Sequence, residues 1–144
     1  MKWGEITWIF LHTLSVQIQE TQYNVLKTEL FNHVKSLCSC LPCPDCAMHA
    51  TQYLSRMPVP PTKSDFIRML LVFHNDINQR NKKPIFYLPQ MKKYNVVNLT
   101  LAFNVCKHII THQPYNPRII MNKLKTSKCL KDLTLWLQKN NLIR

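Results

Sequence analysis

The chain has 144 residues and contains one glycine, Gly4. This scarcity constrains both the fold and any binding site. Glycine-rich phosphate loops such as GxGxxG and the Walker A loop need several glycines, so the sequence excludes them. A bound nucleotide would instead be held by side chains and helix ends. Abundant Leu, Lys, Asn and Gln favour helices, and the length is that of one domain.

The spacing of apolar residues predicts an all-α fold. It predicts helices over residues 3–18, 23–37 and 43–56, a fourth helix that begins after residue 61, and two more over residues 95–112 and 128–140. Pro58, Pro60 and Pro61 predict an extended link before the fourth helix, which Thr62 or Ser64 can cap. Residues 85–89 are expected to form a connector.

Two cysteines, Cys43 and Cys46, stand at the predicted start of the third helix. Proline is well tolerated in the first turn of a helix, so Pro44 places Cys43 near the N-cap. Cys46 then lies in the first turn, where free backbone N–H groups and the helix dipole favour a thiolate. His49 follows on the same helical face. The arrangement predicts a dithiol that can close, open and exchange near neutral pH.

Two further polar and aromatic groups lie on other predicted helices. One consists of Trp8 and His12, and the other is the set His74, Asn75, Asn78 and Lys82. Taken singly, each residue has a structural explanation in a core or on a surface. Asparagine is nevertheless a poor helix former, so two in one helix need a reason. The second set can supply ring stacking, amide donors and a cation for a phosphate, and so predicts a nucleotide site.

Three segments together resemble the Erv/Alr family of FAD-linked sulfhydryl oxidases. Residues 3–12, WGEITWIFLH, resemble the opening motif WGxxxWxxLH of that family. Residues 43–50, CPDCAMHA, resemble its CxxCxxHA centre, and residues 74–83, HNDINQRNKK, resemble its HNxVN…K segment. The segments occur in family order and cover about residues 3–83. The compact form is similar to the versions carried by large cytoplasmic DNA viruses.

The resemblance implies a four-helix bundle that holds FAD, with a short fifth helix packed across it. Residues 1–90 would form this oxidase core, and residues 91–144 would form an additional basic helical C-terminal region. The family usually forms homodimers through its first two helices. The implied cofactor contacts are Trp8 and His12 at the flavin or its ribityl part, His49 beside the disulfide, His74, Asn75 and Asn78 at the adenosine half, and Lys82 or alternatively Lys83 at the pyrophosphate.

The chain departs from the family pattern at three places. Val16 and Gln17 occupy the region where many members place a tyrosine. Leu71 stands where many members have a cysteine of a second structural disulfide, so that disulfide is expected to be absent. Phe86 and Tyr87 are candidates for the aromatic pair of the adenine pocket.

The resemblance also implies a reaction. A substrate thiolate would attack Cys43, expected to be the more accessible sulfur, and form a mixed disulfide. Cys46 would leave as a thiolate next to the flavin, and electrons would pass through FAD to molecular oxygen, giving hydrogen peroxide. The expected substrates are protein thiols, among them a thioredoxin-like carrier. His49 is a candidate for tuning the environment of the flavin.

The remaining four cysteines leave alternatives open. Cys38 and Cys40 have a CxC spacing that can close a redox disulfide, although two inert thiols are the favoured interpretation. Cys106 and Cys129 are a second candidate pair. The main non-enzyme alternative is a zinc-binding interaction module that uses Cys38, Cys40, Cys43 and Cys46. The favoured reading includes no metal site.

Positive charge is concentrated toward the C-terminus. The formal net charge is +12, and residues 91–144 contribute ten basic side chains against one acidic residue, Asp132. This region is expected either to meet nucleic acid, an anionic membrane or an acidic partner, or to form a solvated cationic face. No signal peptide or membrane-spanning segment is apparent. We therefore expect synthesis in the cytosol or nucleus and, with the viral resemblance, the cytoplasm of an infected cell or the virion.

Overall fold

The computed structural model of the chain describes the backbone of residues 1–114 and 119–144, with side chains described for residues 1–114 and 123–144. Every regular element in these residues is a helix, which confirms the all-α prediction. The order is α1 (Trp3–Gln17), α2 (Glu20–Ser39), α3 (Pro44–Ser55), α4 (Lys63–Arg80), the 3-10 helix η1 (Leu88–Val96), α5 (Leu99–Thr111) and α6 (Ile119–Lys139).

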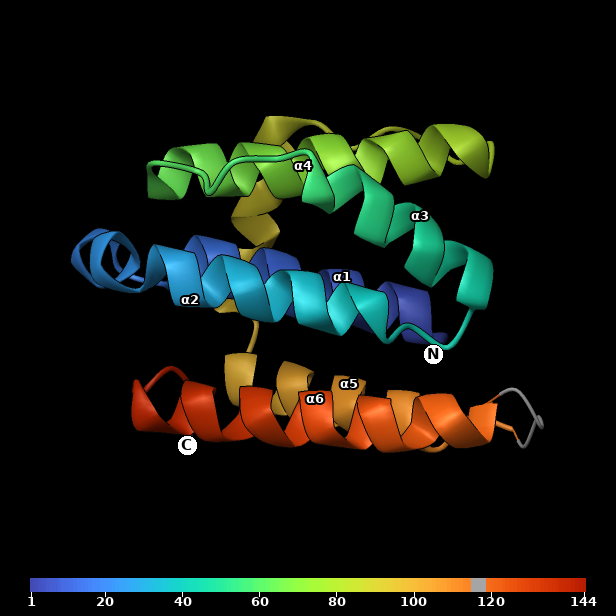
Figure 1. Cartoon of the computed structure of the whole chain (residues 1–144). Coiled ribbons are helices and arrows are strands. Elements are labelled where there is room, and N and C mark those ends of the chain that lie inside the picture. Colours follow the sequence, from blue (N-terminus) through green and yellow to red (C-terminus); the bar gives the residue numbers. More distant parts are fainter. Residues whose placement is uncertain (115–118) are drawn as a thin grey trace.

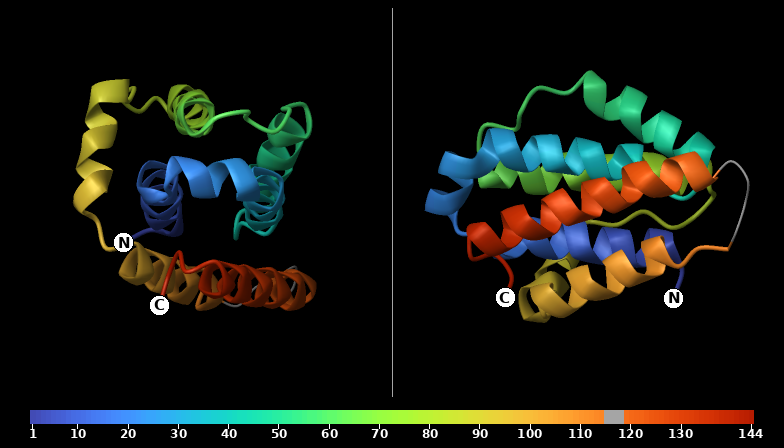
Figure 2. Two further views of the ribbon diagram at one scale, coloured as in Figure 1. Left: turned by 90° about the vertical axis from the view of Figure 1, so that its left-hand side faces the viewer. Right: turned by 60° about the horizontal axis from the view of Figure 1, so that its bottom comes forward.

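The helices form three layers (Figure 1). Helices α1 and α2 make the middle layer, α3 and α4 cover one of its faces, and α5 and α6 cover the other. Helix η1 runs along the side of the stack, from the α4 layer to the α5 layer (Figure 2, left). None of the described helices is long and apolar enough to cross a membrane.

The local sequence explains where the helices begin. Pro44 occupies the first turn of α3 after the N-cap Cys43. The hydroxyl of Thr62 accepts a hydrogen bond from the backbone N–H of Asp65 at 3.1 Å, so Thr62 and not Ser64 caps α4. Asn98 caps α5 in the same way, accepting from the N–H of Leu101 at 3.0 Å.

Two predicted boundaries are wrong. The expected helix over residues 95–112 is shorter, because η1 occupies the chain up to Val96 and Asn98 then starts a new helix. Helix η1 starts within the expected connector. Its start is explained by Pro89 in its first turn and by the side chain of Gln90, which accepts from the N–H of Tyr87 at 2.6 Å. The last helix begins at Ile119 rather than near residue 128, because its first half contains no residue that breaks a helix although its apolar periodicity is weak.

One hydrophobic core joins all three layers. Phe10 and Phe31 of the middle layer, Phe66 of α4, Phe103 of α5 and Leu137 of α6 are almost completely buried within it. Core residues therefore come from both sides of the sequence boundary proposed near residue 90. That boundary falls inside η1.

Helix η1 has its own attachment to the rest of the fold. Met91 and Tyr94 are buried in a smaller cluster with Leu71 of α4. At the far end of η1, the side-chain amide of Gln17 donates to the backbone oxygens of Tyr94 at 2.8 Å and of Val97 at 2.6 Å. These contacts fix the position of η1 against α1 and α4.

Candidate functional site

The three sequence segments described above meet at one cavity of about 940 Å³. The volume lies in the range of small-molecule and cofactor sites. Helices α1, α3, α4 and η1 contribute to the wall, as does the segment that follows α4. The wall residues that matter for the chemistry are Trp8, Cys46, His49, His74, Asn78, Lys83, Phe86, Gln90, Lys93 and Tyr94.

A stack of rings forms the apolar part of this wall. The rings of Trp8 and His74 are nearly parallel, at 9°, with centroids 4.2 Å apart, and the ring of Phe86 also stacks on His74, with centroids 5.3 Å apart. His12 lies one turn after Trp8 on α1, and its Nε2 is 2.9 Å from Nδ1 of His74. His12 itself is 1% exposed and does not line the cavity. It therefore supports the wall from behind.

Both histidines of the stack are neutral near pH 7. Burial, assisted by His74 and Lys93, lowers the pKa of His12 to about 3. Burial, assisted by Lys83 and Lys93, lowers the pKa of His74 to about 4. Since a neutral imidazole has one N–H, a single hydrogen is shared in the contact between the two rings. The stack thus offers polar edges without placing a charge in the wall.

The two asparagines of α4 have different roles. Asn78 lines the cavity, and its Nδ2 is buried without a hydrogen-bond partner among the described residues. Asn75 points to the chain instead, where its side chain donates to the oxygen of Phe86 at 2.8 Å and accepts from the N–H of Phe86 at 2.9 Å. Asn75 therefore holds Phe86 in place against His74, while Asn78 keeps a donor for a ligand.

Lysines gather at one edge of the cavity. Lys83 lines it, whereas Lys82 is not part of the wall and has the left-handed φ of 56° that ends α4. Helix η1 adds Lys93, whose ammonium lies 4.4 Å from the ring centre of Phe86. The sequence reasoning missed Lys93 because it lies beyond the matching segments, although a basic pair at residues 92–93 was a visible signal. Lys83 and Lys93 together favour an anionic group at this edge.

The two cysteines of the predicted redox centre differ in their position. Cys46 is exposed and lines the cavity, whereas Cys43 is half-buried and does not. The expectation that Cys43 is the more accessible sulfur is therefore wrong. The physical reason is the N-cap position, which turns Sγ of Cys43 back onto the first helical turn, where it accepts from the N–H of Cys46 at 3.2 Å.

The expected thiolate at Cys46 is also wrong for the reduced pair. Partial burial of the sulfur and the neighbouring thiol of Cys43 raise the pKa of Cys46 to about 11. The N–H of the first turn that was expected to stabilise a Cys46 thiolate is directed to Cys43 instead. A Cys46 thiolate would instead arise when a closed Cys43–Cys46 disulfide is opened by attack at Cys43.

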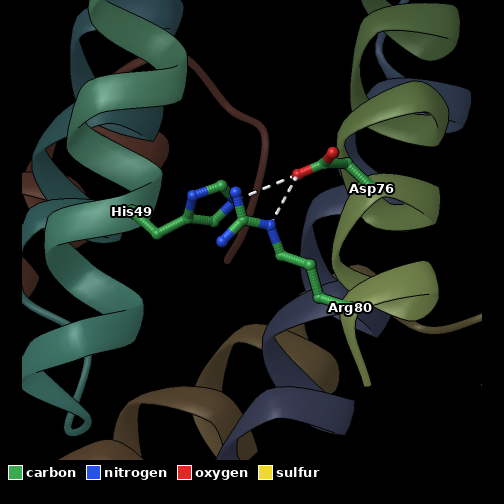
Figure 3. A network of polar contacts seen from close by, with 3 residues as sticks. All are labelled: His49, Asp76 and Arg80. Carbon is green, nitrogen blue, oxygen red and sulfur yellow. Dashed lines mark hydrogen bonds and ion pairs between the residues drawn. The ribbon is translucent and has the colours of Figure 1, made fainter. Parts of the chain in front are cut away.

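A polar network holds α3 against α4 next to the dithiol (Figure 3). Nε2 of His49 lies 3.0 Å from Oδ2 of Asp76, and Nε of Arg80 lies 3.6 Å from the same oxygen. An ionised carboxylate can only accept, so the hydrogen of the first contact is on Nε2 of His49. Because His49 also lines the cavity, the network fixes the orientation of one wall residue. Asp76, an acid inside a polar helical segment, was not identified from the sequence.

The other four cysteines lie on α2 and its C-cap, on α5 and on α6. All six are unpaired in the structure. Thr7 of α1 contacts Cys106 at 3.7 Å, whereas Ser36 of α2 donates to Cys129 at 3.5 Å. Cys38 is buried, and burial raises its pKa to about 12. Cys106 and Cys129 therefore face different helices.

The described residues contain no group of three or more His, Cys, Asp or Glu side chains placed to hold a metal ion. This finding weighs against the zinc-binding alternative. In contrast, the ring stack, the free amide of Asn78 and the two lysines suit a ligand with aromatic rings and anionic groups. Cys46 lies on the same wall.

Comparisons with known proteins agree with this geometry. The model of the Erv1 / Alr family matches residues 5–97. A protein named FAD-linked sulfhydryl oxidase from the Malawi tick isolate of African swine fever virus is 30% identical over 64% of this chain and 78% of its own length. Its counterpart in a Kenyan pig isolate is 29% identical over the same shares. A protein of Invertebrate iridescent virus 3 is 28% identical over 57% of each chain. No solved structure gave a significant match.

Proposed function

The chain belongs to the Erv1 / Alr family, and from this premise we propose that it is an FAD-dependent thiol oxidase that forms disulfides in protein substrates. The observation that carries the proposal is the position of Cys46. One sulfur of a two-cysteine centre lies on the wall of a cavity that the other two family segments complete. A dithiol for exchange and a site for an aromatic, anionic cofactor are therefore adjacent.

The residues present fit FAD. Nδ2 of Asn78 is a buried donor without a partner among the described residues, so a cofactor acceptor would satisfy it. Trp8, His74 and Phe86 provide ring surfaces for stacking. Lys83, and Lys93 with it, would hold the pyrophosphate. In this assignment Lys82 ends the helix, while His12 and Asn75 hold the wall residues from behind.

The dithiol would do the exchange chemistry. A substrate thiolate attacks Sγ of Cys43, the sulfur that lies outside the cavity wall and so away from the cofactor, which breaks the bond between Cys43 and Cys46 and leaves a mixed disulfide. The electron pair of the broken bond remains on Sγ of Cys46, at the cavity wall. A second substrate thiolate then attacks the substrate sulfur of the mixed disulfide and releases Cys43. FAD, when bound, supplies the chemistry that takes two electrons from the dithiol and passes them to molecular oxygen, giving hydrogen peroxide.

His49 has a positioning role in this proposal. Its ring is fixed by Asp76 and lines the cavity three residues after Cys46. A ring held in one orientation can shape the polarity around the sulfur and the cofactor. The proposed physiological substrates are protein thiols, among them those of a thioredoxin-like carrier.

A spectrum and an oxygen electrode test the proposal. The purified full chain should be yellow with flavin absorbance, and dithiothreitol should start oxygen uptake with equal formation of peroxide. A colourless protein that cannot be loaded with FAD would overturn the proposal. So would a flavoprotein that consumes no oxygen with any dithiol.

A homodimer is the proposed assembly, and the structure restricts where it can form. Helix α5 packs against α1 and α6 against α2 (Figure 2), so a dimer through the first two helices would use only their exposed remainder. Val25 of α2, 83% exposed, belongs to that remainder. Light scattering should give twice the chain mass of 17.1 kDa, and Val25→Glu should reduce it to one chain. A mass of one chain for the unaltered protein would contradict the dimer.

We further propose that the protein works in the cytoplasm of an infected cell or in the virion, as the viral relatives suggest. The basic region of residues 91–144 would meet an acidic partner or nucleic acid there. Binding to a DNA duplex that weakens steeply with salt would support the second partner. Lack of binding at low salt would leave the charge as a solvated face.

A further inference from the structure

We propose that Cys40 and Cys129 form a disulfide that fastens α6 to the end of α2. These two cysteines are outside the dithiol centre described above, and nothing in the proposed reaction uses them. Cys40 is the C-cap residue of α2, and Cys129 lies in the middle of α6. They are 89 positions apart in the sequence. Cys40 lies within the part that matches the family, and Cys129 lies in the C-terminal region beyond it.

The contacts between α2 and α6 place the two sulfurs opposite each other. Ser36, one turn before Cys40, donates to Sγ of Cys129 at 3.5 Å. Thr126, one turn before Cys129, donates to the backbone oxygen of Cys40 at 3.3 Å. These two hydrogen bonds bracket the cysteines, and each of the two thiols shifts the pKa of the other.

The other two buried cysteines have further neighbours of their own. Cys106 contacts Thr7 on α1. Cys38 projects toward the cavity, whose wall it joins. Cys40 and Cys129 are each 7% exposed, and Cys40 lines a narrow cavity of about 30 Å³ together with Leu41 and Thr126. A space of that size admits about one water molecule.

The protonation of the pair suits exchange. The neighbouring thiol of Cys129, with help from Ser39 and Lys125, lowers the pKa of Cys40 to about 6. The same contact raises the pKa of Cys129. At neutral pH the pair therefore consists of one thiolate and one thiol. The thiolate is the nucleophile that disulfide exchange needs.

The closing reaction balances with a small disulfide as oxidant. The thiolate of Cys40 attacks one sulfur of oxidised glutathione, breaks its S–S bond and releases one glutathione thiolate. Cys129 then loses its proton and attacks Sγ of Cys40 in the mixed disulfide, which releases the second glutathione. Two protein thiols have become one disulfide, and one small disulfide has become two thiols.

The bond would have a specific structural effect. Cys40 lies three residues before Cys43, so it sits at the base of the turn that carries the dithiol centre. A covalent link to α6 would hold that base against the C-terminal layer. It would also close a long loop that contains α3, α4, η1 and α5, and so restrict the unfolded chain.

The test counts thiols in the full chain with Cys43→Ser and Cys46→Ser, which removes the reactive pair and any self-oxidation. This parent is treated with oxidised glutathione, denatured, alkylated with a maleimide and weighed. Two of its four cysteines should react. After the further change Cys129→Ser, two should react and the chain should carry one glutathione on Cys40, seen as added mass, whereas after the matched control change Cys106→Ser one should react and no glutathione should be bound.

Several outcomes would overturn the proposal. Four reactive thiols in the parent would mean that no bond forms. One reactive thiol after Cys129→Ser would mean that Cys38 and Cys40 pair, and three after Cys106→Ser would mean that Cys106 is in the bond. As a second measurement, the oxidised parent and its Cys106→Ser form should melt about 10 °C above their reduced forms. No rise should occur after Cys129→Ser. Because no turnover is measured, these results are independent of the oxidase proposal.

Discussion

Helix α1 has two sides that are built according to different physical requirements. Toward α5, Phe10 packs its ring against Phe103 with centroids 5.0 Å apart, and both are almost completely buried. Toward α4, Trp8 and His12 take part in a ring stack that forms one wall of the large cavity and its support. The first side is closely packed, while the second contains space and polar groups.

The comparison shows where this fold gives up stability for binding. A buried donor without a partner costs about 1–3 kcal/mol. The described residues include such donors or acceptors on His12, Thr13 and Asn78, two of them in or beside the cavity wall. The packed side is held by dispersion contacts between large apolar side chains. A ligand in the cavity would provide hydrogen bonds and packing contacts to the cavity side of α1, as α5 provides packing contacts to the other side.

The largest difference in effect between a substitution at the cavity and one on the packed side should come from Cys46→Ser. We expect loss of dithiol-driven oxygen uptake by more than about 1,000-fold with retention of flavin, because the sulfur at the wall is removed while the ring stack stays. Oxygen uptake and flavin absorbance measure this. Cys106→Ser on the packed side is the matched control and should keep its activity. Substantial peroxide formation by Cys46→Ser would contradict the role of that sulfur.

Phe103→Ala should act on the packed side alone. Removing a fully buried phenyl group leaves a cavity, and we expect a loss of about 3–5 kcal/mol in the free energy of unfolding. Urea unfolding of the flavin-free protein measures the loss. The exposed Leu101 of the same helix offers a control, since Leu101→Ala should cost less than about 1 kcal/mol. Equal losses in the two variants would mean that α5 is not packed as described.

Asn78→Leu should have opposite effects on stability and binding. The change removes an unsatisfied buried amide, so the flavin-free protein should unfold at the same or slightly higher denaturant concentration. The cofactor loses a donor, and we expect its dissociation constant to rise about 10-fold or more. Flavin fluorescence after dialysis measures retention, and Asn104→Leu at an exposed position of α5, outside the cavity wall, serves as the control. Unchanged retention would remove Asn78 from the binding site.

Acidification should lower the free energy of unfolding through the two histidines of the cavity side, and this effect should be smaller than those of the substitutions above. The pKa values of His12 and His74 are about 3 and 4 in the folded chain, below their ordinary value of 6.5. The unfolded chain therefore binds more protons below pH 6.5, and stability falls as the pH falls through that window. Melting temperatures of the flavin-free protein should decrease from pH 6.5 to 5, above the range in which most carboxylates titrate. His12→Gln should flatten this slope, and a flat curve for the unaltered chain would refute the assignment.

The sequence predicted the elements whose signals are local. Pro44 after Cys43 located the start of α3, and Thr62 with Asp65 located the start of α4, because caps depend on a few neighbouring residues. The cavity residues Trp8, Cys46, His49, His74 and Asn78 were also identified, since each lies in a segment with a recognisable pattern. Helix η1 was missed because a 3-10 helix has little periodicity of its own.

Properties that depend on distant neighbours could not be predicted. The exposure of Cys43 and Cys46 depends on which way the N-cap sulfur turns and on the wall supplied by α1 and α4. The task of Asn75 depends on Phe86, which reaches it only after the chain has turned back. Lys93 joins the cavity through the path of η1. In each case the deciding contact joins segments that no local pattern connects.

Gln17 sets the spacing between the family part of the molecule and its C-terminal helices. One side-chain amide serves the oxygens of both Tyr94 and Val97, so the chain between these residues must return to a single point on α1. A longer or shorter connector would leave one of the two oxygens beyond reach. The length of the chain between η1 and α5 is therefore fixed by this contact. We expect insertions and deletions to occur at other connections between helices. A glutamine 77 positions upstream of Tyr94 thus limits how this junction can change in evolution.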